Sequence, residues 1–111
     1  MIEQVLVNLI TNACQAMEGV EGAKLLEIAS AVQDGRIVLR VSDSGPGVPP
    51  SLREKVFDPF FTTRKEGSGI GLSFSHRIVA DHGGSVRVDT SRWGGAEFRI
   101  ELPAAREGAP A

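Results

Sequence analysis

Two asparagines one helical turn apart are the first residues of the chain that could hold a ligand. Asn8 and Asn12 lie within residues 2–17, where apolar residues recur at steps of three and four. This period predicts an amphipathic helix, and Gln15 falls on the same polar flank as the asparagines. A carboxamide oxygen is a neutral hard ligand that suits magnesium. The spacing alone would equally fit solvated side chains, so the pair needs support from other segments.

A carboxylate and two glycines follow the strand that we expect at residues 36–42. They are Asp43, Gly45 and Gly47. Glycine lets the backbone approach a ligand closely, because no Cβ stands in the way. A carboxylate at the end of the strand could accept a proton from the amino group of adenine, where guanine presents a carbonyl. A plain Asp/Gly/Pro turn would have the same composition, so this adenine site is one of two interpretations.

A third segment, residues 62–72, has the composition of a phosphate site with a lid. Its glycines open a helix expected at residues 72–82, and the amides at a helix N-terminus bind anions. Hydroxyls and two cations stand just before the glycines and could close over phosphate oxygens. The candidate residues are Thr62, Thr63, Arg64, Lys65, Gly67, Ser68, Gly69, Ile70, Gly71 and Leu72. The pattern is not a Walker motif. A flexible loop before a helix is the alternative to a phosphate site. Either Arg64 or Lys65 could reach the phosphates.

The elements that must position these residues come as a helix, a hairpin, a helix and a second hairpin. The first hairpin turns at Asp34-Gly35, a favoured turn sequence, and the second spans Trp93-Gly94-Gly95. A short helix is expected at residues 52–56. This order predicts an α+β fold, a two-layer sandwich whose mixed, mostly antiparallel sheet has helices on one face. We expect one domain at residues 1–103 and a disordered tail at 104–111.

Composition and charge limit the class of protein. The 111 residues are 41% hydrophobic and 23% charged, which suits a single globular domain. The net charge of -2 disfavours nucleic acid as a partner. The single cysteine, Cys14, is expected to be a reduced, buried core residue of a cytoplasmic protein. The helical pattern already runs at Ile2 without a capping residue, which indicates a fragment of a longer chain.

Taken in order, these segments resemble the catalytic and ATP-binding domain of sensor histidine kinases. The superfamily also includes gyrase, the ninety-kilodalton heat-shock chaperone and mismatch-repair ATPases, and it implies the Bergerat-type ATP-binding fold. The resemblance runs from Gln4 to Pro103. Its motifs are an N-box at residues 4–13, a G1 box at 43–47, an F-box at 57–61 and a G2 box at 67–72. The stretches 12–17 and 60–63 are most similar to the nitrogen-regulation branch.

The resemblance assigns roles to individual residues. It implies that Asn12 binds Mg²⁺, that Asp43 binds the amino group of ATP, and that the G2 glycines line the phosphates. The ATPases of the superfamily have a glutamate base where this chain has Asn8, and an amide cannot accept that proton. Transfer to a stronger nucleophile is therefore favoured, with magnesium and Lys65 or Arg64 neutralising charge. The rivals are a conformational ATPase, against which Asn8 argues, and a nucleotide-binding pseudo-enzyme, against which the intact motifs argue.

The resemblance also implies partners, because the phosphate acceptor of this family is a histidine on a separate helical hairpin. His76 and His82 fall on the helix after the glycines, and we expect structural roles for both. The implied partners are the dimerisation and histidine-phosphotransfer domain of the same parent chain and the receiver domain of a response regulator. We expect a monomeric fragment of a homodimeric parent, with this domain in the cytoplasm. One departure is Ala96, where the family usually has threonine; the lost hydroxyl would cost about 1 kcal/mol of ATP binding.

Overall fold

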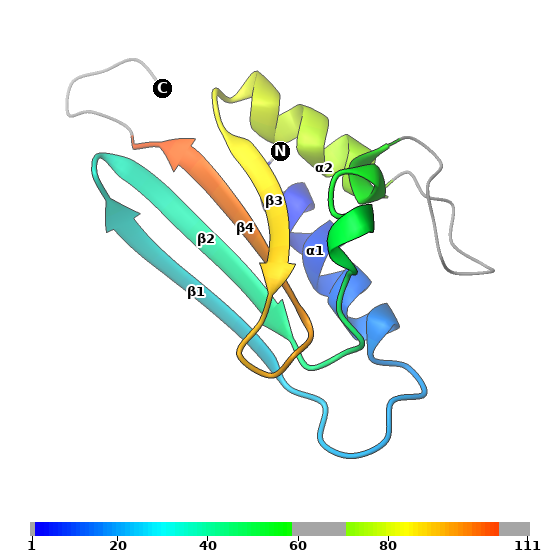
Figure 1. Cartoon of the computed structure of the whole chain (residues 1–111). Coiled ribbons are helices and arrows are strands. Elements are labelled where there is room, and N and C mark those ends of the chain that lie inside the picture. Colours follow the sequence, from blue (N-terminus) through cyan, green and yellow to red (C-terminus); the bar gives the residue numbers. More distant parts are fainter. Residues whose placement is uncertain (1, 59–70, 105–111) are drawn as a thin grey trace.

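The described part of the chain folds into two layers, a four-stranded antiparallel sheet and two α-helices on one of its faces (Figure 1). The structure is a computed structural model that describes residues 2–58 and 71–104. Its elements are α1 (Ile2–Ala16), β1 (Leu26–Gln33), β2 (Arg36–Asp43), the 3-10 helices η1 (Pro50–Leu52) and η2 (Lys55–Phe57), α2 (Gly71–Asp81), β3 (Ser85–Thr90) and β4 (Ala96–Pro103). The predicted α+β sandwich is confirmed.

The strand order is β1-β2-β4-β3, so each hairpin places its strands side by side and β4 joins the two hairpins. The turn of the first hairpin is the predicted Asp34-Gly35. Both residues have positive φ, 51° and 75°, as a tight two-residue hairpin turn requires. At the far end of the sheet the amide of Ala104 donates to the carbonyl of Gly35 at 3.0 Å. Residues 105–111, the rest of the expected tail, lie outside the described residues.

The core lies between the sheet and the two helices. α1 presents Val5, Leu9 and Ala13 at four-residue steps, and none of the three is exposed to solvent. They belong to the same hydrophobic cluster as Phe98 and Ile100, alternate residues of β4 that face the same way and are also fully buried. The rest of this core comprises Val41, Val56, Val79, Val86, Val88 and Ala96. Because α1 is anchored over this length, the polar flank next to its buried stripe is held in a fixed orientation.

Two expectations about local structure are wrong. Cys14 is exposed, because it follows Ala13 and one residue of helix turns the side chain about 100° away from the buried stripe. The single short helix expected at residues 52–56 is instead η1 and η2, separated by a turn at residues 53–54. The Arg53 side chain, in this turn, donates to the Val48 carbonyl and to Thr90 Oγ1. Short 3-10 turns are a common way to connect larger elements.

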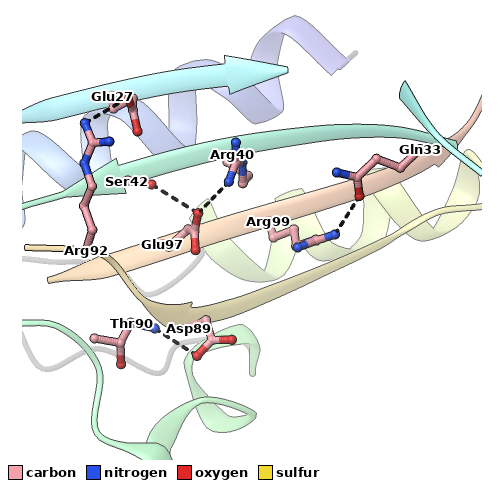
Figure 2. A network of polar contacts seen from close by, with 9 residues as sticks. All are labelled: Glu27, Gln33, Arg40, Ser42, Asp89, Thr90, Arg92, Glu97 and Arg99. Atoms are coloured by element: carbon pink, nitrogen blue, oxygen red, sulfur yellow. Dashed lines mark hydrogen bonds and ion pairs between the residues drawn. The ribbon is translucent and has the colours of Figure 1, made fainter. Parts of the chain in front are cut away.

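The sheet face that points away from α1 and α2 carries charged side chains (Figure 2). Arg40 of β2 and Arg87 of β3 both lie opposite Arg99 of β4, which makes a row of three arginines. Like charges in direct opposition are unfavourable. Neighbouring carboxylates offset them, with Arg40 and Glu97 3.8 Å apart and Arg87 and Glu101 3.9 Å apart. These exposed pairs contribute little to stability, and the face is best described as a solvated charged surface.

The outer strand β1 is only partly covered by the helix layer (Figure 1). Ile28 pairs with the buried Val41 and therefore points to the helix side, yet it is 52% exposed. Val32, on the same side, is 72% exposed.

Among the residues that the structure describes, no helix is both long and apolar enough to cross a membrane.

Candidate functional site

Asp43 is a buried carboxylate with one oxygen in use and one without a partner. It is the last residue of β2 and is 1% exposed. Its Oδ1 accepts hydrogen bonds from the amides of Gly45, at 2.9 Å, and Ala96, at 3.1 Å. Its Oδ2 has no hydrogen-bond partner in the part of the chain that the structure describes. A buried acceptor left unpaired is costly, so this oxygen is suited to receive a donor from a ligand.

Glycines bring three segments close to this carboxylate. A Cβ on Gly95 would stand 2.2 Å from the Asp43 carbonyl oxygen and 2.5 Å from its Oδ1, so only glycine fits there. A Cβ on Gly45 would stand 3.1 Å from the same Oδ1 and 3.3 Å from the carbonyl oxygen of Ala16. Gly47 has a φ of 79°, a conformation that favours glycine. The end of α1, the loop after β2 and the turn before β4 therefore meet at Asp43.

Ala96 takes part in this site through its backbone rather than its side chain. Its amide is one of the two donors to Asp43 Oδ1, and the residue is only 4% exposed, within the core. Any residue other than proline would keep the amide contact. The weaker ATP binding expected from Ala96 therefore concerns only the missing side-chain hydroxyl. The hydrogen bond from the Ala96 amide to the Asp43 carboxylate does not depend on that hydroxyl.

Asn8 connects α1 to the first turn of α2. Its side chain is half-buried, and its Nδ2 donates to Ser75 Oγ at 3.4 Å. Ser75 is fully buried and donates in turn to the carbonyl of Gly71, the first residue of α2. The Asn8 Oδ1 accepts a hydrogen bond from Gln4 at 3.1 Å. The asparagine helix and the end of the G2 box therefore meet. Leu72 continues α2 with a half-buried side chain.

Asn12 lies between these two ends of the site. Its side chain is half-buried and, within residues 2–58 and 71–104, makes no hydrogen bond to another residue. Gln15, the third predicted residue on this flank, is exposed. From Asn8 to Ala16, which adjoins the Asp43 loop, α1 rises about 12 Å. The flank is therefore long enough for an extended ligand that reaches from Asp43 to Gly71.

The lid and most of the G2 box lie outside the described residues. These are Thr62, Thr63, Arg64, Lys65, Gly67, Ser68, Gly69 and Ile70. Phe57, which starts the F-box, packs edge-on against Phe98 with ring centres 6.2 Å apart and lies 5.5 Å from the ring of His76. It anchors the start of this segment to the core. The Nδ1 of His82 lies 2.8 Å from the Ile78 carbonyl oxygen. Each of the two histidines of α2 therefore contacts another group of the protein, His76 the Phe57 ring and His82 the Ile78 carbonyl.

A cavity of about 450 Å³ lies elsewhere, between η2, α2 and β3. Phe57, His76 and Val88 are among its lining residues, and none of the predicted ligand-binding residues is. The described residues also contain no group of three or more His, Cys, Asp and Glu that could hold a metal ion. A magnesium site in the described region would therefore depend on an amide such as Asn12 together with oxygens from the ligand.

Sequence comparison assigns the chain to a family. Residues 1–106 match the family described as histidine kinase-, DNA gyrase B-, and HSP90-like ATPase. The chain is 41% identical to the C4-dicarboxylate transport sensor protein DctS of Rhodobacter capsulatus, over 100% of this chain and 17% of that protein. It is 42% identical to the sensor protein FixL of Bradyrhizobium diazoefficiens, over 96% of this chain and 21% of that protein. The chain thus spans about a fifth of the length of these relatives.

Solved structures agree with this assignment. The catalytic domain of the histidine kinase ThkA is 37% identical with a TM-score of 0.79, over 97% of this chain and 69% of that chain. Full-length ShkA, solved in complex with AMPPNP, is 35% identical with a TM-score of 0.81, over 99% of this chain and 22% of that chain. The chain belongs to the family of histidine kinase-, DNA gyrase B- and HSP90-like ATPases, as an ATP-binding catalytic domain of the sensor histidine kinase type.

Proposed function

We propose that this domain binds Mg-ATP and transfers its γ-phosphoryl group to a histidine on a separate dimerisation domain of the parent protein, for relay to a response-regulator aspartate. The observation that carries the proposal is the unpaired, buried Oδ2 of Asp43 at the end of the asparagine helix. A fixed acceptor in a dry site is suited to the amino group of adenine, and it would be left unpaired by guanine.

The residues around Asp43 support recognition of the base. The amides of Gly45 and Ala96 hold Oδ1 from one side, so the carboxylate cannot turn without losing both donors. The preorganised carboxylate therefore needs little rearrangement to accept a hydrogen bond from the base. Gly45 and Gly47 let the loop after β2 pack closely against Asp43 and the turn before β4, which keeps the carboxylate in place.

The magnesium and phosphate end is proposed from Asn12 and the G2 box. The half-buried Asn12 would offer its amide oxygen to Mg²⁺, and the ion, when bound, neutralises charge on the phosphates. Gly71, at the start of α2, and the preceding G2 glycines would present amides to the phosphates. In this proposal Thr62, Thr63 and either Lys65 or Arg64 bind phosphate oxygens from the lid.

Asn8 supports phosphoryl transfer rather than hydrolysis. Its amide is bonded to Ser75 and Gln4, and an amide has no basic site that could take a proton from water. A histidine nitrogen needs no such base, because its lone pair attacks phosphorus directly. In the proposed step a P–N bond forms, the bond from the γ-phosphorus to the bridging oxygen breaks, and ADP leaves with that oxygen.

The proposed partners are the dimerisation and histidine-phosphotransfer domain of the same parent chain and a response-regulator receiver domain. The histidine kinase ThkA, which is 34% identical to this chain, was solved in complex with the response regulator TrrA. We further propose a homodimeric parent of the nitrogen-regulation branch, a monomeric isolated domain and a cytoplasmic site of action.

The test is to incubate the domain with γ-labelled ATP and a dimerisation domain from a related sensor kinase, here that of FixL. Label on the histidine of the dimerisation domain is the expected result, and it should disappear when that histidine is replaced by glutamine. Free labelled phosphate without labelled histidine would indicate the conformational ATPase. ATP binding without any turnover, also when the parent's own dimerisation domain is supplied, would indicate the pseudo-enzyme.

A further inference from the structure

Ser91 lies where the turn between β3 and β4 touches Asp43, and it belongs to none of the motifs described above. Its side chain is 5% exposed. The Ser91 hydroxyl donates to the carbonyl oxygen of Asp43 at 2.6 Å. The Oγ of Ser91 in turn accepts hydrogen bonds from the amides of Gly95, at 3.0 Å, and Trp93, at 3.2 Å. One buried hydroxyl thus connects the turn to the backbone of the candidate base-recognition residue.

The sheet register explains why the Asp43 carbonyl needs this donor. β2 and β4 pair regularly as far as Ser42 and Glu97, so the next pair would be Asp43 and Ala96. On the β1 side the amide of Ser44 donates to Leu25. Hydrogen-bonded pairs alternate along antiparallel strands, so the carbonyl of Asp43 points toward β4.

The expected donor to that carbonyl is the amide of Ala96, but this amide bonds to the carboxylate instead. The Ala96 amide lies 3.1 Å from Asp43 Oδ1. The hydroxyl of Ser91 donates to the Asp43 carbonyl in place of that amide. The carboxylate of Asp43 is thus inserted into the ladder between β2 and β4, and Ser91 satisfies the backbone group that this insertion displaces.

We propose that Ser91 is a positioning residue for base recognition, because its bond to the Asp43 carbonyl keeps the Ala96 amide on Oδ1 and Oδ2 toward the ligand. The proposal rests on the proposed function of Asp43 as the acceptor for adenine. Without the hydroxyl, the Ala96 amide can return to the carbonyl and close the ladder. The carboxylate then keeps only the amide of Gly45 and is free to turn.

The test compares two nucleotides that differ only at the 6-amino group. Wild type and Ser91→Ala are titrated calorimetrically with ATP and with purine riboside triphosphate, which lacks that group. The variant should bind ATP about tenfold more weakly, the equivalent of one hydrogen bond, and purine riboside triphosphate almost as well as wild type. Its preference for the amino group should therefore fall. Ser91→Thr, which keeps the hydroxyl, should restore the preference, and Ser30→Ala on the exposed part of β1 is the matched control.

A merely structural role would give a different result. If Ser91→Ala lowers the melting temperature and weakens both nucleotides by the same factor, or leaves the preference intact, the proposal is overturned. Should Ser91→Ala not fold, Ser91→Cys keeps the shape with a much weaker donor, and the same comparison decides. Asp43→Asn distinguishes base recognition by Asp43 from the positioning role of Ser91. If it keeps the wild-type preference, base recognition by Asp43 itself is refuted; if it loses the preference while Ser91→Ala retains it, only the role of Ser91 fails.

Discussion

Asp43→Asn should invert the choice of base, because the surroundings of this side chain determine its orientation. The two fixed donors, the amides of Gly45 and Ala96, lie 2.9 Å and 3.1 Å from Oδ1. An asparagine must therefore turn its oxygen toward them, since its amino group would place a donor against two donors. The amino group then stands where Oδ2 stands now. It would face the amino group of ATP, donor against donor, and would complement the 6-carbonyl of inosine triphosphate.

The magnitude follows from one hydrogen bond to a charged acceptor. Losing such a bond costs about 1.5–3 kcal/mol, which corresponds to about 10–100-fold in affinity. ATP should therefore bind about 10–100-fold more weakly to Asp43→Asn, whereas inosine triphosphate should bind at least as well as it does to wild type. The assay is calorimetric titration of both nucleotides against both proteins. Asp89→Asn, on the charged face of the sheet, is the control for a change of one charge. Equal weakening of both nucleotides would refute the reasoning, because it would mean that Asp43 only stabilises the fold.

Three further predictions concern other parts of the site. Asn12→Ala should reduce the strengthening of ATP binding by magnesium, measured by titration with and without the ion; a variant with undiminished magnesium dependence would contradict the metal assignment. Gly95→Ala should lower stability by about 3 kcal/mol, seen as a fall in the melting temperature, because the new Cβ would stand 2.2 Å from the Asp43 carbonyl oxygen; wild-type melting would show that this contact is not tight. Asn8→Glu should increase the release of free phosphate from ATP, measured with a phosphate sensor, because a carboxylate can accept a proton from water; unchanged release would count against the role of Asn8 in favouring transfer over hydrolysis.

The parts of the fold that could be predicted are those specified by local patterns. Asp34-Gly35 predicts its own turn because two successive positive φ angles suit few other residue pairs. The stripe of α1 is visible because three buried residues recur at four-residue steps. The burial of a residue outside such a stripe is harder to predict from the sequence. The expected burial of Cys14 is wrong because its apolar neighbours in sequence are not its neighbours on the helix surface.

The sequence indicates candidate residues for the site but not the contacts that connect them. Asp43, Gly45 and Asn8 are candidates because of their types and spacing and because of the motifs in which they lie. Their contacts depend on long-range packing, such as the bond of Asn8 to Ser75, 67 residues further along the chain. Ser91 had no recognisable signal, because a serine in a turn is ordinary and its partner is a backbone carbonyl 48 residues away. The exposure of the helix-facing side of β1 was also not predictable, since apolar alternation in a strand does not show how far the helix layer extends.

The most direct test of the account is a structure of this domain with magnesium and a non-hydrolysable ATP analogue. The account predicts that Asp43 Oδ2, which now lacks a partner, lies within hydrogen-bond distance, about 2.7–3.2 Å, of the amino group of adenine. It also predicts that the Ala96 amide remains on Oδ1. A base bound elsewhere, with Oδ2 still unpaired or facing only protein groups, would contradict the central claim that this carboxylate recognises the nucleotide.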